Sequence, residues 1–303
     1  MSRRVSVGTR GSTLALTQTN LVVSALQAIH VGVDFTTHVI HTQGDWNQKA
    51  SLQSIGGQGA FVGEIEAALL RGEIDLAVHS LKDMPAAERP GLALHATLQR
   101  EDPRDVLISR AGVPLSQLPA NARVGTGSAR RIAQLRQLRP DLDIADIRGN
   151  VDTRLRKLDV GDYDAIVLAS AGLLRLGLHE RVTQYFSIQD MIPAPGQGIL
   201  AVQTRSDNDW LNEIVTAIVD RPTQIAARAE RAFLARLGAG CQLPVAAHAT
   251  TDEAINSLTL RTLLGSDDGL SVVRDVATAP LNQAEVLGAR MAEGALRRME
   301  TAW

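Results

Sequence analysis

Two loops of the same type stand out, GTRGS at residues 8–12 and GTGS at residues 125–128. Each follows a strand-like run and precedes a helical pattern. A helix start offers unpaired N–H groups, hydroxyls and the positive end of the helix dipole, which suit an anion. Ordinary N-capping by the serine of each loop is the alternative. Arg10 lies in the first loop, and Arg130 and Arg131 follow the second, so the pair of loops favours anion binding.

Arginine is concentrated in one stretch, since residues 123–156 contain eight arginines and four aspartates in a chain of formal net charge −2. Arg130 and Arg131 open a predicted helix, where the dipole disfavours a cation. Their position therefore requires an anion, either from a ligand or from a nearby acid. Three more arginines follow strand-like runs, where ligands of open α/β sheets bind: Arg148, Arg154 and Arg175. The set predicts a ligand with several carboxylates or phosphates, and surface ion pairs are the alternative.

A carboxylate and a rare lysine end another strand-like run. Lys82 is one of only three lysines in the chain, and Asp83 follows it directly. In a two-lobed fold, Asp83 would face the cleft, where a carboxylate can act as a general acid/base and offset a cationic intermediate. A Lys-Asp pair is also common in surface turns, so the residues alone leave both interpretations open.

The only cysteine, Cys241, lies in a loop flanked by glycines and closed by a proline. A lone cysteine is most often a small buried hydrophobe, but this loop favours an accessible and reactive thiol. One cysteine excludes an intramolecular disulfide and a thiolate zinc site. The histidines show no metal-ligand spacing, so we expect no metal.

The composition narrows the class of protein. The chain has 303 residues, with 31 Lys+Arg against 33 Asp+Glu and 3% aromatic residues. This balance argues against a nucleic-acid partner and against a polybasic membrane binder. No signal peptide and no apolar run near the ~18 residues of a membrane span is evident, so we expect a cytoplasmic protein.

The elements that must position these residues are predicted to form two similar lobes. Residues 72–78 and 161–167 each combine a glycine helix cap, an acidic turn and an apolar strand. Together with the two loops, in the same order, they predict an α/β fold of two doubly wound lobes with largely parallel sheets. Residues 101–105 and 192–198 are predicted crossings, so the chain returns from lobe two to finish lobe one.

The rest of the chain is predicted to form an α+β domain with a small antiparallel sheet. After residue 221 come a predicted helix, three runs of alternating apolar and polar residues, and a final helix. We expect lobe one at residues 1–98 and 199–216, lobe two at 104–192, and the C-terminal domain at 221–303.

Taken together, these residues resemble the hydroxymethylbilane synthase family, also called porphobilinogen deaminase. The resemblance covers essentially the whole chain. It rests on residues 9–12 (TRGS), 77–85 (AVHSLKDMP), 100–105 (REDPRD), 125–131 (GTGSARR), 148–151 (RGNV), 195–198 (PGQG) and 240–244 (GCQLP).

The resemblance implies lobes like those of periplasmic ligand-binding proteins and a transferase of tetrapyrrole biosynthesis (EC 2.5.1.61). Such an enzyme condenses four porphobilinogen molecules head to tail with loss of ammonia, then releases the linear tetrapyrrole with water. Growth starts on a dipyrromethane cofactor held by a thioether at Cys241. The expected form is a monomer with no nucleic-acid or membrane partner.

The resemblance also assigns roles, with Asp83 as the catalytic aspartate. The implied cofactor-binding residues are Cys241, Lys82, Thr126, Ser128, Arg130, Arg131, Arg148 and Gly149. The implied substrate-binding residues are Arg10, Ser12, Arg148, Arg154, Arg175 and Gln197. Each pyrrole carries an acetate and a propionate, which accounts for an arginine-lined cleft.

Two positions depart from the family pattern. Gln58 stands where the family often has lysine, and Gly127 replaces a frequent serine. The polar, glycine-rich residues 44–59 predict a gate over the cleft, with Gln58 and Phe61 as its gate-loop residues. A non-catalytic two-lobed anion-binding sensor is the competing interpretation, and a transferase that uses Cys241 as a transient nucleophile is another.

Overall fold

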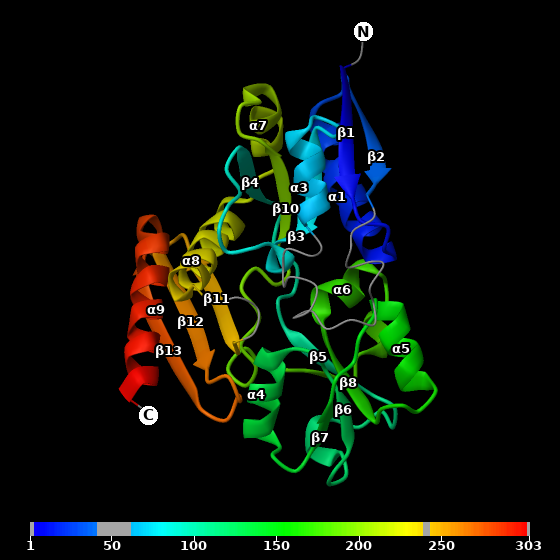
Figure 1. Ribbon diagram of the computed structural model, residues 1–303, viewed down its shortest axis with the longest axis vertical. Helices are drawn as coiled ribbons and strands as arrows, with labels where there is room; N and C mark the ends of the chain where they lie inside the picture. The colour runs from blue at the N-terminus through cyan, green and yellow to red at the C-terminus, as the bar shows by residue number, and fades with distance from the viewer. Residues whose placement is uncertain (1–2, 41–61, 239–242, 302–303) are drawn as a thin grey trace.

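The computed structural model describes residues 3–40, 62–238 and 243–301. Three predicted site residues, Gln58, Phe61 and Cys241, lie outside these ranges. Figure 1 shows two lobes, one above the other, and a C-terminal domain at their side.

The first lobe is built on a five-stranded sheet of order β2-β1-β3-β10-β4. Its elements are β1 (Arg3–Thr9), α1 (Thr13–Ile29), β2 (Val33–Val39), α3 (Gly63–Leu70), β3 (Leu76–Ser80), the 3-10 turn η2 (Leu81–Asp83), β4 (Leu92–Thr97), β10 (Leu200–Arg205) and α7 (Asp209–Thr216). β1 pairs in parallel with β2 and β3, whereas β10 runs antiparallel to β3 and β4. β10 comes after the whole second lobe in the sequence, so the chain does return to this sheet.

The second lobe repeats this arrangement with the order β7-β6-β8-β5-β9. Its elements are β5 (Asp105–Ser109), η3 (Leu115–Gln117), β6 (Arg123–Gly125), α4 (Ala129–Leu138), β7 (Asp143–Ala145), α5 (Val151–Asp159), β8 (Ala165–Ala169), α6 (Ser170–Arg175), η4 (His179–Arg181) and β9 (Gln184–Tyr185). β5 is the antiparallel strand here and takes the place that β10 has in the first sheet. The strands that carry the chain between the lobes therefore occupy equivalent positions.

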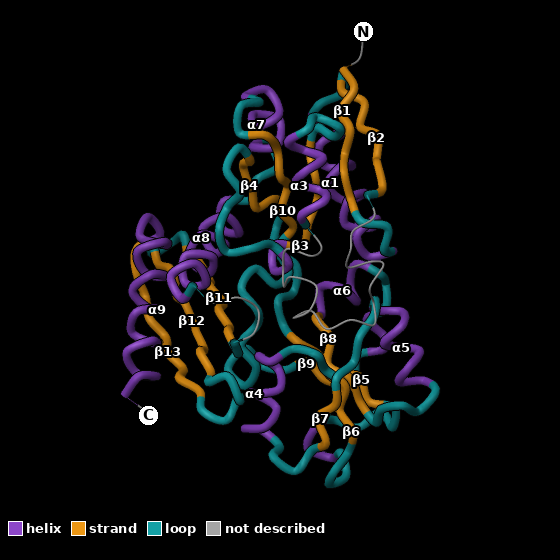
Figure 2. The backbone as a smooth tube through the Cα atoms, viewed as in Figure 1, coloured by secondary structure: helices purple, strands orange, loops and turns teal. Residues whose placement is uncertain are grey.

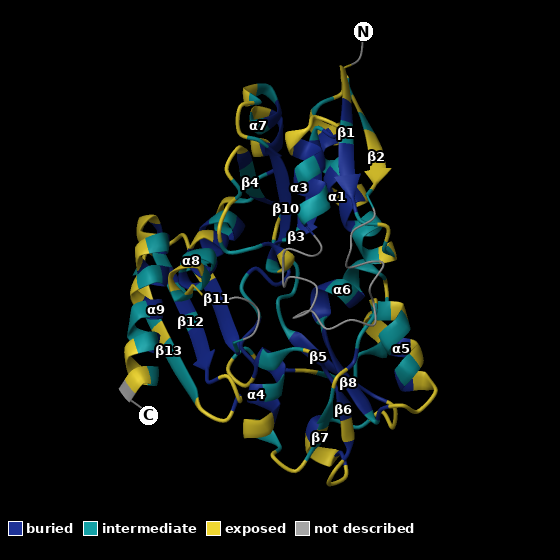
Figure 3. Cartoon of the chain, viewed as in Figure 1, coloured by how far each residue is buried: buried dark blue, intermediate teal, exposed yellow. Residues whose placement is uncertain are grey.

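Helices cover both faces of each sheet. In lobe one, Val22 and Leu26 of α1 pack on one face, while Ile65 and Leu69 of α3 pack on the other. In lobe two, α4 covers one face and α5 and α6 cover the other. The strands between them are buried, as Figure 3 shows for β5 and β8, and their sequences are mostly apolar. The predicted doubly wound fold class is confirmed.

The C-terminal domain is an antiparallel sheet of order β11-β12-β13, with two helices packed against it. Its elements are α8 (Arg221–Leu237), β11 (Val245–Asp252), β12 (Ser257–Gly265), β13 (Val272–Pro280), η5 (Leu281–Gln283) and α9 (Ala284–Thr301). Phe233, Leu260 and Leu287 join both helices to one face of the sheet. Figure 2 shows the two helices beside the three strands. The predicted α+β arrangement is confirmed.

Helix α8 begins with a capping aspartate, Asp220, and has a proline, Pro222, in its first turn. Asp220 Oδ2 accepts a hydrogen bond from the Thr223 N–H at 3.0 Å, and proline fits the first helical turn. The helix ends at Gly238, whose φ of 61° is left-handed. Within the described residues, no helix has the length and apolar character needed to span a membrane.

Candidate active site

The predicted site residues follow the carboxyl ends of parallel strands in both lobes. In lobe one, Arg10 and Ser12 come after β1, and Lys82 and Asp83 come after its neighbour β3. In lobe two, Thr126 and Ser128 follow β6, and Arg148 follows β7. Arg175 lies in α6, which follows β8. Parallel neighbours end at the same edge of a sheet, so each lobe gathers its polar loops at one edge.

The two edges face each other: a Cβ at Gly172, in α6 of lobe two, would lie 3.5 Å from Leu14 Cδ2, in α1 of lobe one. Burial lowers the pKa of Lys82 to about 8, with opposing effects from the charges of Asp83 and Arg131. Burial also lowers the pKa of Arg154 to about 10, and the charges of Arg131 and Asp83 act on it as well. Asp83 belongs to lobe one and Arg154 to lobe two. The site therefore spans the two lobes.

The turn that carries Asp83 is held firmly while its carboxylate stays exposed. The Leu81 N–H donates to Ile199 O at 3.0 Å, and the Met84 N–H donates to Leu81 O at 3.1 Å. The Leu81 and Met84 side chains are buried. Gly196 lies behind the turn with φ of 74°, and a Cβ there would be 2.8 Å from Leu81 Cγ. An exposed acid on a rigid turn suits proton transfer to a bound substrate.

The serines of the two glycine-containing loops do cap helices. Ser12 Oγ accepts from the Ala15 N–H at 3.2 Å, and Ser128 Oγ accepts from the Arg131 N–H at 3.4 Å. Thr126 Oγ1 accepts from the Ser128 N–H at 3.3 Å. In each case the hydroxyl acts as an acceptor, so its hydrogen can still be donated to an anion. Capping and anion binding are therefore compatible in both loops.

Arg130 and Arg131 bind a buried acid, Asp105, the first residue of β5. Arg130 Nη1 donates to Asp105 Oδ2 at 2.5 Å, and Arg131 Nη2 donates to Oδ1 at 2.7 Å. Both arginines are nine-tenths buried, and Asp105 is fully buried. Burial alone would raise the pKa of Asp105, but the charges of both arginines outweigh it and hold that pKa well below its usual range. Asp105 is thus a nearby acid of the kind that the helix-start position requires.

Gln197 completes this cluster. Its Nε2 donates to Asp105 Oδ1 at 3.0 Å and to Pro103 O at 2.7 Å, and the residue is 1% exposed. Arg130 Nη1 also donates to Ile192 O at 2.8 Å. The cluster therefore ties both interlobe crossings to the start of α4. A substrate contact for Gln197 stays a prediction, and its observed contacts lie between the two interlobe crossings.

Arg154 and Arg175 differ from this pair because they are only half-buried and donate to backbone carbonyls. Arg154 Nε donates to Gly149 O at 2.8 Å, and Arg175 Nη2 donates to Gly198 O at 2.7 Å. Among the described residues, neither has an ion-pair partner within 4.0 Å. Burial lowers the pKa of each to about 10, so both remain cationic at neutral pH. They are suited to bind the carboxylates of a ligand.

Arg148 is held by Asp146, an acid of the same loop, with Arg148 Nε 2.6 Å from Asp146 Oδ2. Gly149 has φ of 112°, and a Cβ there would lie 2.7 Å from Thr153 Cγ2, so this turn requires glycine. At Gly127, a Cβ would lie 2.6 Å from Asp146 Oδ1. A serine at position 127 would therefore need the Asp146 carboxylate to move.

Two family models together match almost the whole chain. The dipyrromethane cofactor binding domain of porphobilinogen deaminase matches residues 5–213, and the C-terminal domain of porphobilinogen deaminase matches residues 224–297. The chain belongs to the porphobilinogen deaminase family. The resemblance found in the sequence motifs is thereby confirmed.

Curated porphobilinogen deaminases align along nearly their full length. The protein of Syntrophotalea carbinolica is 48% identical over 297 residues, covering 98% of this chain and 94% of the relative. That of Roseiflexus sp. is 47% identical over 295 residues, covering 97% and 96%. Among solved structures, the methionine binding protein MetQ is 13% identical, with a TM-score of 0.46, and the match covers 71% of this chain and 89% of that one.

Sequence reasoning missed two acids of this porphobilinogen deaminase site, Asp105 and Asp146. Asp105 opens a run of buried apolar residues, and a charged residue in that position is a signal that could have been noticed. Asp146 lies two residues before Arg148, and this spacing does not by itself predict the ion pair between them. No group of three or more His, Cys, Asp or Glu in the described part of the chain could hold a metal ion.

Proposed function

We propose that this protein condenses four porphobilinogen molecules head to tail, with loss of ammonia at each step, and releases the linear tetrapyrrole hydroxymethylbilane with water. The observation that carries the proposal is that the exposed Asp83 carboxylate of lobe one lies near enough to the half-buried Arg154 of lobe two for its charge to act on that guanidinium. Family membership supports the same reaction.

Carboxylate recognition follows from the charges of the site. Each pyrrole brings an acetate and a propionate, and arginine binds carboxylates with paired N–H groups. We assign Arg10, Ser12, Arg154 and Arg175 to the substrate. Arg130 and Arg131 share one buried acid, so that cluster keeps one uncancelled positive charge close to Lys82. This fixed charge attracts ligand carboxylates even though Asp105 occupies several of the guanidinium donors.

Asp83 is the proposed acid and base. Its carboxyl group delivers a proton to the aminomethyl nitrogen of porphobilinogen, so that ammonia leaves and a substrate cation remains. The carboxylate then offsets that cation, because it is a fixed negative charge held beside the place where the cation develops. After the new carbon–carbon bond forms, the same carboxylate takes the proton from the pyrrole carbon.

A dipyrromethane, held by a thioether at Cys241, is the proposed cofactor. The residues present fit its carboxylates. Lys82 brings a cation to the edge of the first sheet, and cations and hydroxyls come to the edge of the second sheet from Arg148, Thr126 and Ser128. When bound, the cofactor supplies the pyrrole carbon on which the chain grows. Cys241 must be a free thiol when the cofactor is attached, which supports the proposed cytoplasmic location.

The proposed division into domains keeps residues 1–98 with 199–216, then 104–192, then 221–303. It is supported by the membership of β10 in the first sheet and by the separate C-terminal sheet. We also propose a monomer that acts on porphobilinogen without a nucleic-acid or membrane partner.

The stoichiometry of the reaction tests the proposal. Purified protein incubated with porphobilinogen should release four ammonia molecules for each linear tetrapyrrole. A non-catalytic anion-binding sensor would bind porphobilinogen and release no ammonia. A transferase with a transient nucleophile would gain mass at Cys241 only after substrate is added.

A further inference from the structure

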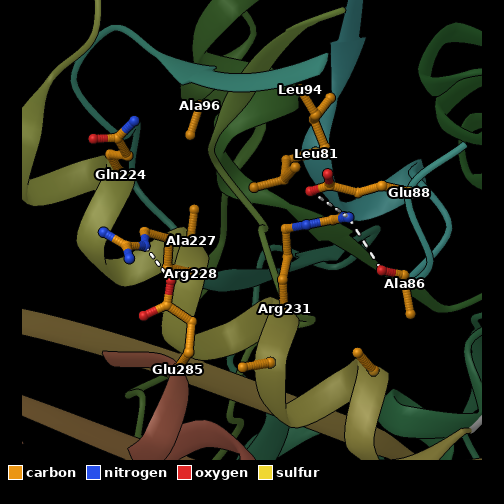
Figure 4. A pocket seen from close by; sticks show the side chains of 12 residues that line it. Leu81, Ala86, Glu88, Leu94, Ala96, Gln224, Ala227, Arg228, Arg231 and Glu285 are labelled. Carbon is orange, nitrogen blue, oxygen red and sulfur yellow. Dashed lines mark hydrogen bonds and ion pairs between the residues drawn. The ribbon is translucent and has the colours of Figure 1, made fainter. Parts of the chain in front are cut away.

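A cavity of about 430 Å³ lies between lobe one and helix α8 of the C-terminal domain. Its walls are mostly apolar and include Leu81, Leu94 and Ala96 from lobe one and Ala227 from α8. Figure 4 shows Arg231 reaching from α8 toward the lobe-one loop at Ala86. Leu81 belongs to η2, so the cavity adjoins the turn that carries Asp83.

Arg231 spans this junction with hydrogen bonds. Its Nη1 donates to Pro85 O and its Nη2 donates to Ala86 O, both at 3.1 Å. The nearest acid, Glu88, is 3.8 Å away and its side chain is 62% exposed, whereas that of Arg231 is only 15% exposed. An exposed acid at that distance stabilises a cation little. The guanidinium is therefore buried mainly to hold two consecutive backbone carbonyls.

Arg228, one turn earlier on α8 and also in the cavity wall, provides a contrast. It pairs with Glu285 of α9, and its side chain is 56% exposed. It makes an ordinary surface ion pair within the C-terminal domain and touches no part of the Asp83 turn in the described contacts. Only Arg231 of these two arginines joins α8 to the catalytic loop.

The carbonyls that Arg231 holds belong to the second and third residues after Asp83. On the other side of Asp83, the turn is fixed by Leu81, whose N–H donates to Ile199 O. The chain that follows the turn passes beside the cavity, so the hydrogen bonds from Arg231 replace close packing there. In the sequence, α8 ends at Leu237, four residues before Cys241.

We propose that Arg231 is a positioning residue for the condensation reaction: it sets the place of the Asp83 turn relative to the helix that precedes Cys241. This rests on the proposed role of Asp83. Arginine suits the task because its planar fork reaches two carbonyls at once, whereas lysine offers a single point charge. A small displacement of a catalytic group can lower the rate by up to about a hundredfold, so loss of the fork should act on kcat.

The test compares Arg231→Met, Arg231→Lys and the matched control Arg228→Met in the cofactor-loaded protein. Arg231→Met should lower kcat by about tenfold while KM stays within about twofold, because Arg231 does not contact substrate. Arg231→Lys should recover part of kcat, and Arg228→Met should keep the wild-type kcat. Thermal midpoints and intact masses establish that each variant is folded and loaded.

Equal kcat values for Arg231→Met and Arg228→Met would overturn the inference. If Arg231→Met does not fold, Arg231→Lys decides: a lower kcat at an unchanged thermal midpoint supports positioning, and a wild-type kcat overturns it. Wild-type protein that releases no ammonia would instead refute the proposed function. Normal Arg231→Met turnover alongside an inactive Asp83→Ala variant would refute the positioning role alone.

Discussion

Replacing Asp105 with asparagine removes the buried charge that holds Arg130 and Arg131 and nearly preserves the side-chain shape. The carboxylate is fully buried and accepts hydrogen bonds from both guanidiniums and from Gln197, at 2.5 to 3.3 Å. In Asp105→Asn, two nine-tenths-buried guanidiniums would face a neutral amide. The variant therefore leaves two buried cations without an acid.

The expected cost is large, because removing one partner of a buried ion pair typically costs about 3–5 kcal/mol of the free energy of unfolding. For a chain of this size, this corresponds to a fall in the thermal midpoint on the order of 10 °C. The matched control is Asp141→Asn. Asp141 binds Arg139 at 2.6 Å, but it lies at the surface, so its loss should leave the midpoint nearly unchanged.

The pH dependence gives a second test. The folded-state pKa of Asp105 lies below its unfolded value of about 3.9, so the ion pair stabilises the protein fully above that value. The stabilisation is lost as pH falls from there toward the folded-state pKa. The difference between wild type and Asp105→Asn should thus be constant from about pH 5 to pH 8 and should shrink in stronger acid.

Scanning calorimetry of wild type, Asp105→Asn and Asp141→Asn across that pH range makes the measurement. Equal midpoints for wild type and Asp105→Asn would refute the reasoning. So would a difference between those two proteins that grows as the pH is lowered below 4.

Other predictions test the site more directly. Asp83→Ala should lower kcat by about a hundredfold or more, and Asp83→Glu should retain more activity, in steady-state assays of ammonia release; near-normal rates in both would make Asp83 structural. The pKa of Lys82 is about 8, so the positive charge that it offers to the cofactor carboxylates is lost as pH rises through that value, and kcat should fall. Lys82→Arg should show no such fall between pH 7 and pH 9, and an identical fall would assign it to another group. Gly198→Ala should lower the thermal midpoint far more than Gly177→Ala. Both glycines have positive φ, but only at Gly198 would a Cβ clash with a backbone oxygen, Glu101 O. Equal losses of stability in the two variants would contradict this.

Local signals in the sequence predicted the elements well. The glycine caps at Gly72 and Gly161 marked two helix ends that lead into buried strands. These features depend on neighbouring residues, so one sequence suffices to recognise them.

Contacts between distant residues were not predictable in the same way. The helix-start position of Arg130 showed that an anion was required, but nothing in the sequence distinguished a ligand from an acid such as Asp105, 25 residues away. The tie between Arg231 and Pro85 joins residues 146 apart. Such pairs depend on how the lobes and the C-terminal domain pack, which periodicity does not reveal.

The intact mass of the protein, purified before any porphobilinogen is added, tests the central claim most directly. The account predicts an excess equal to two linked pyrrole units in the wild type and its absence in Cys241→Ser, which should also lack turnover. A wild-type protein that has the mass of its sequence alone and still produces the linear tetrapyrrole at full rate would contradict the account.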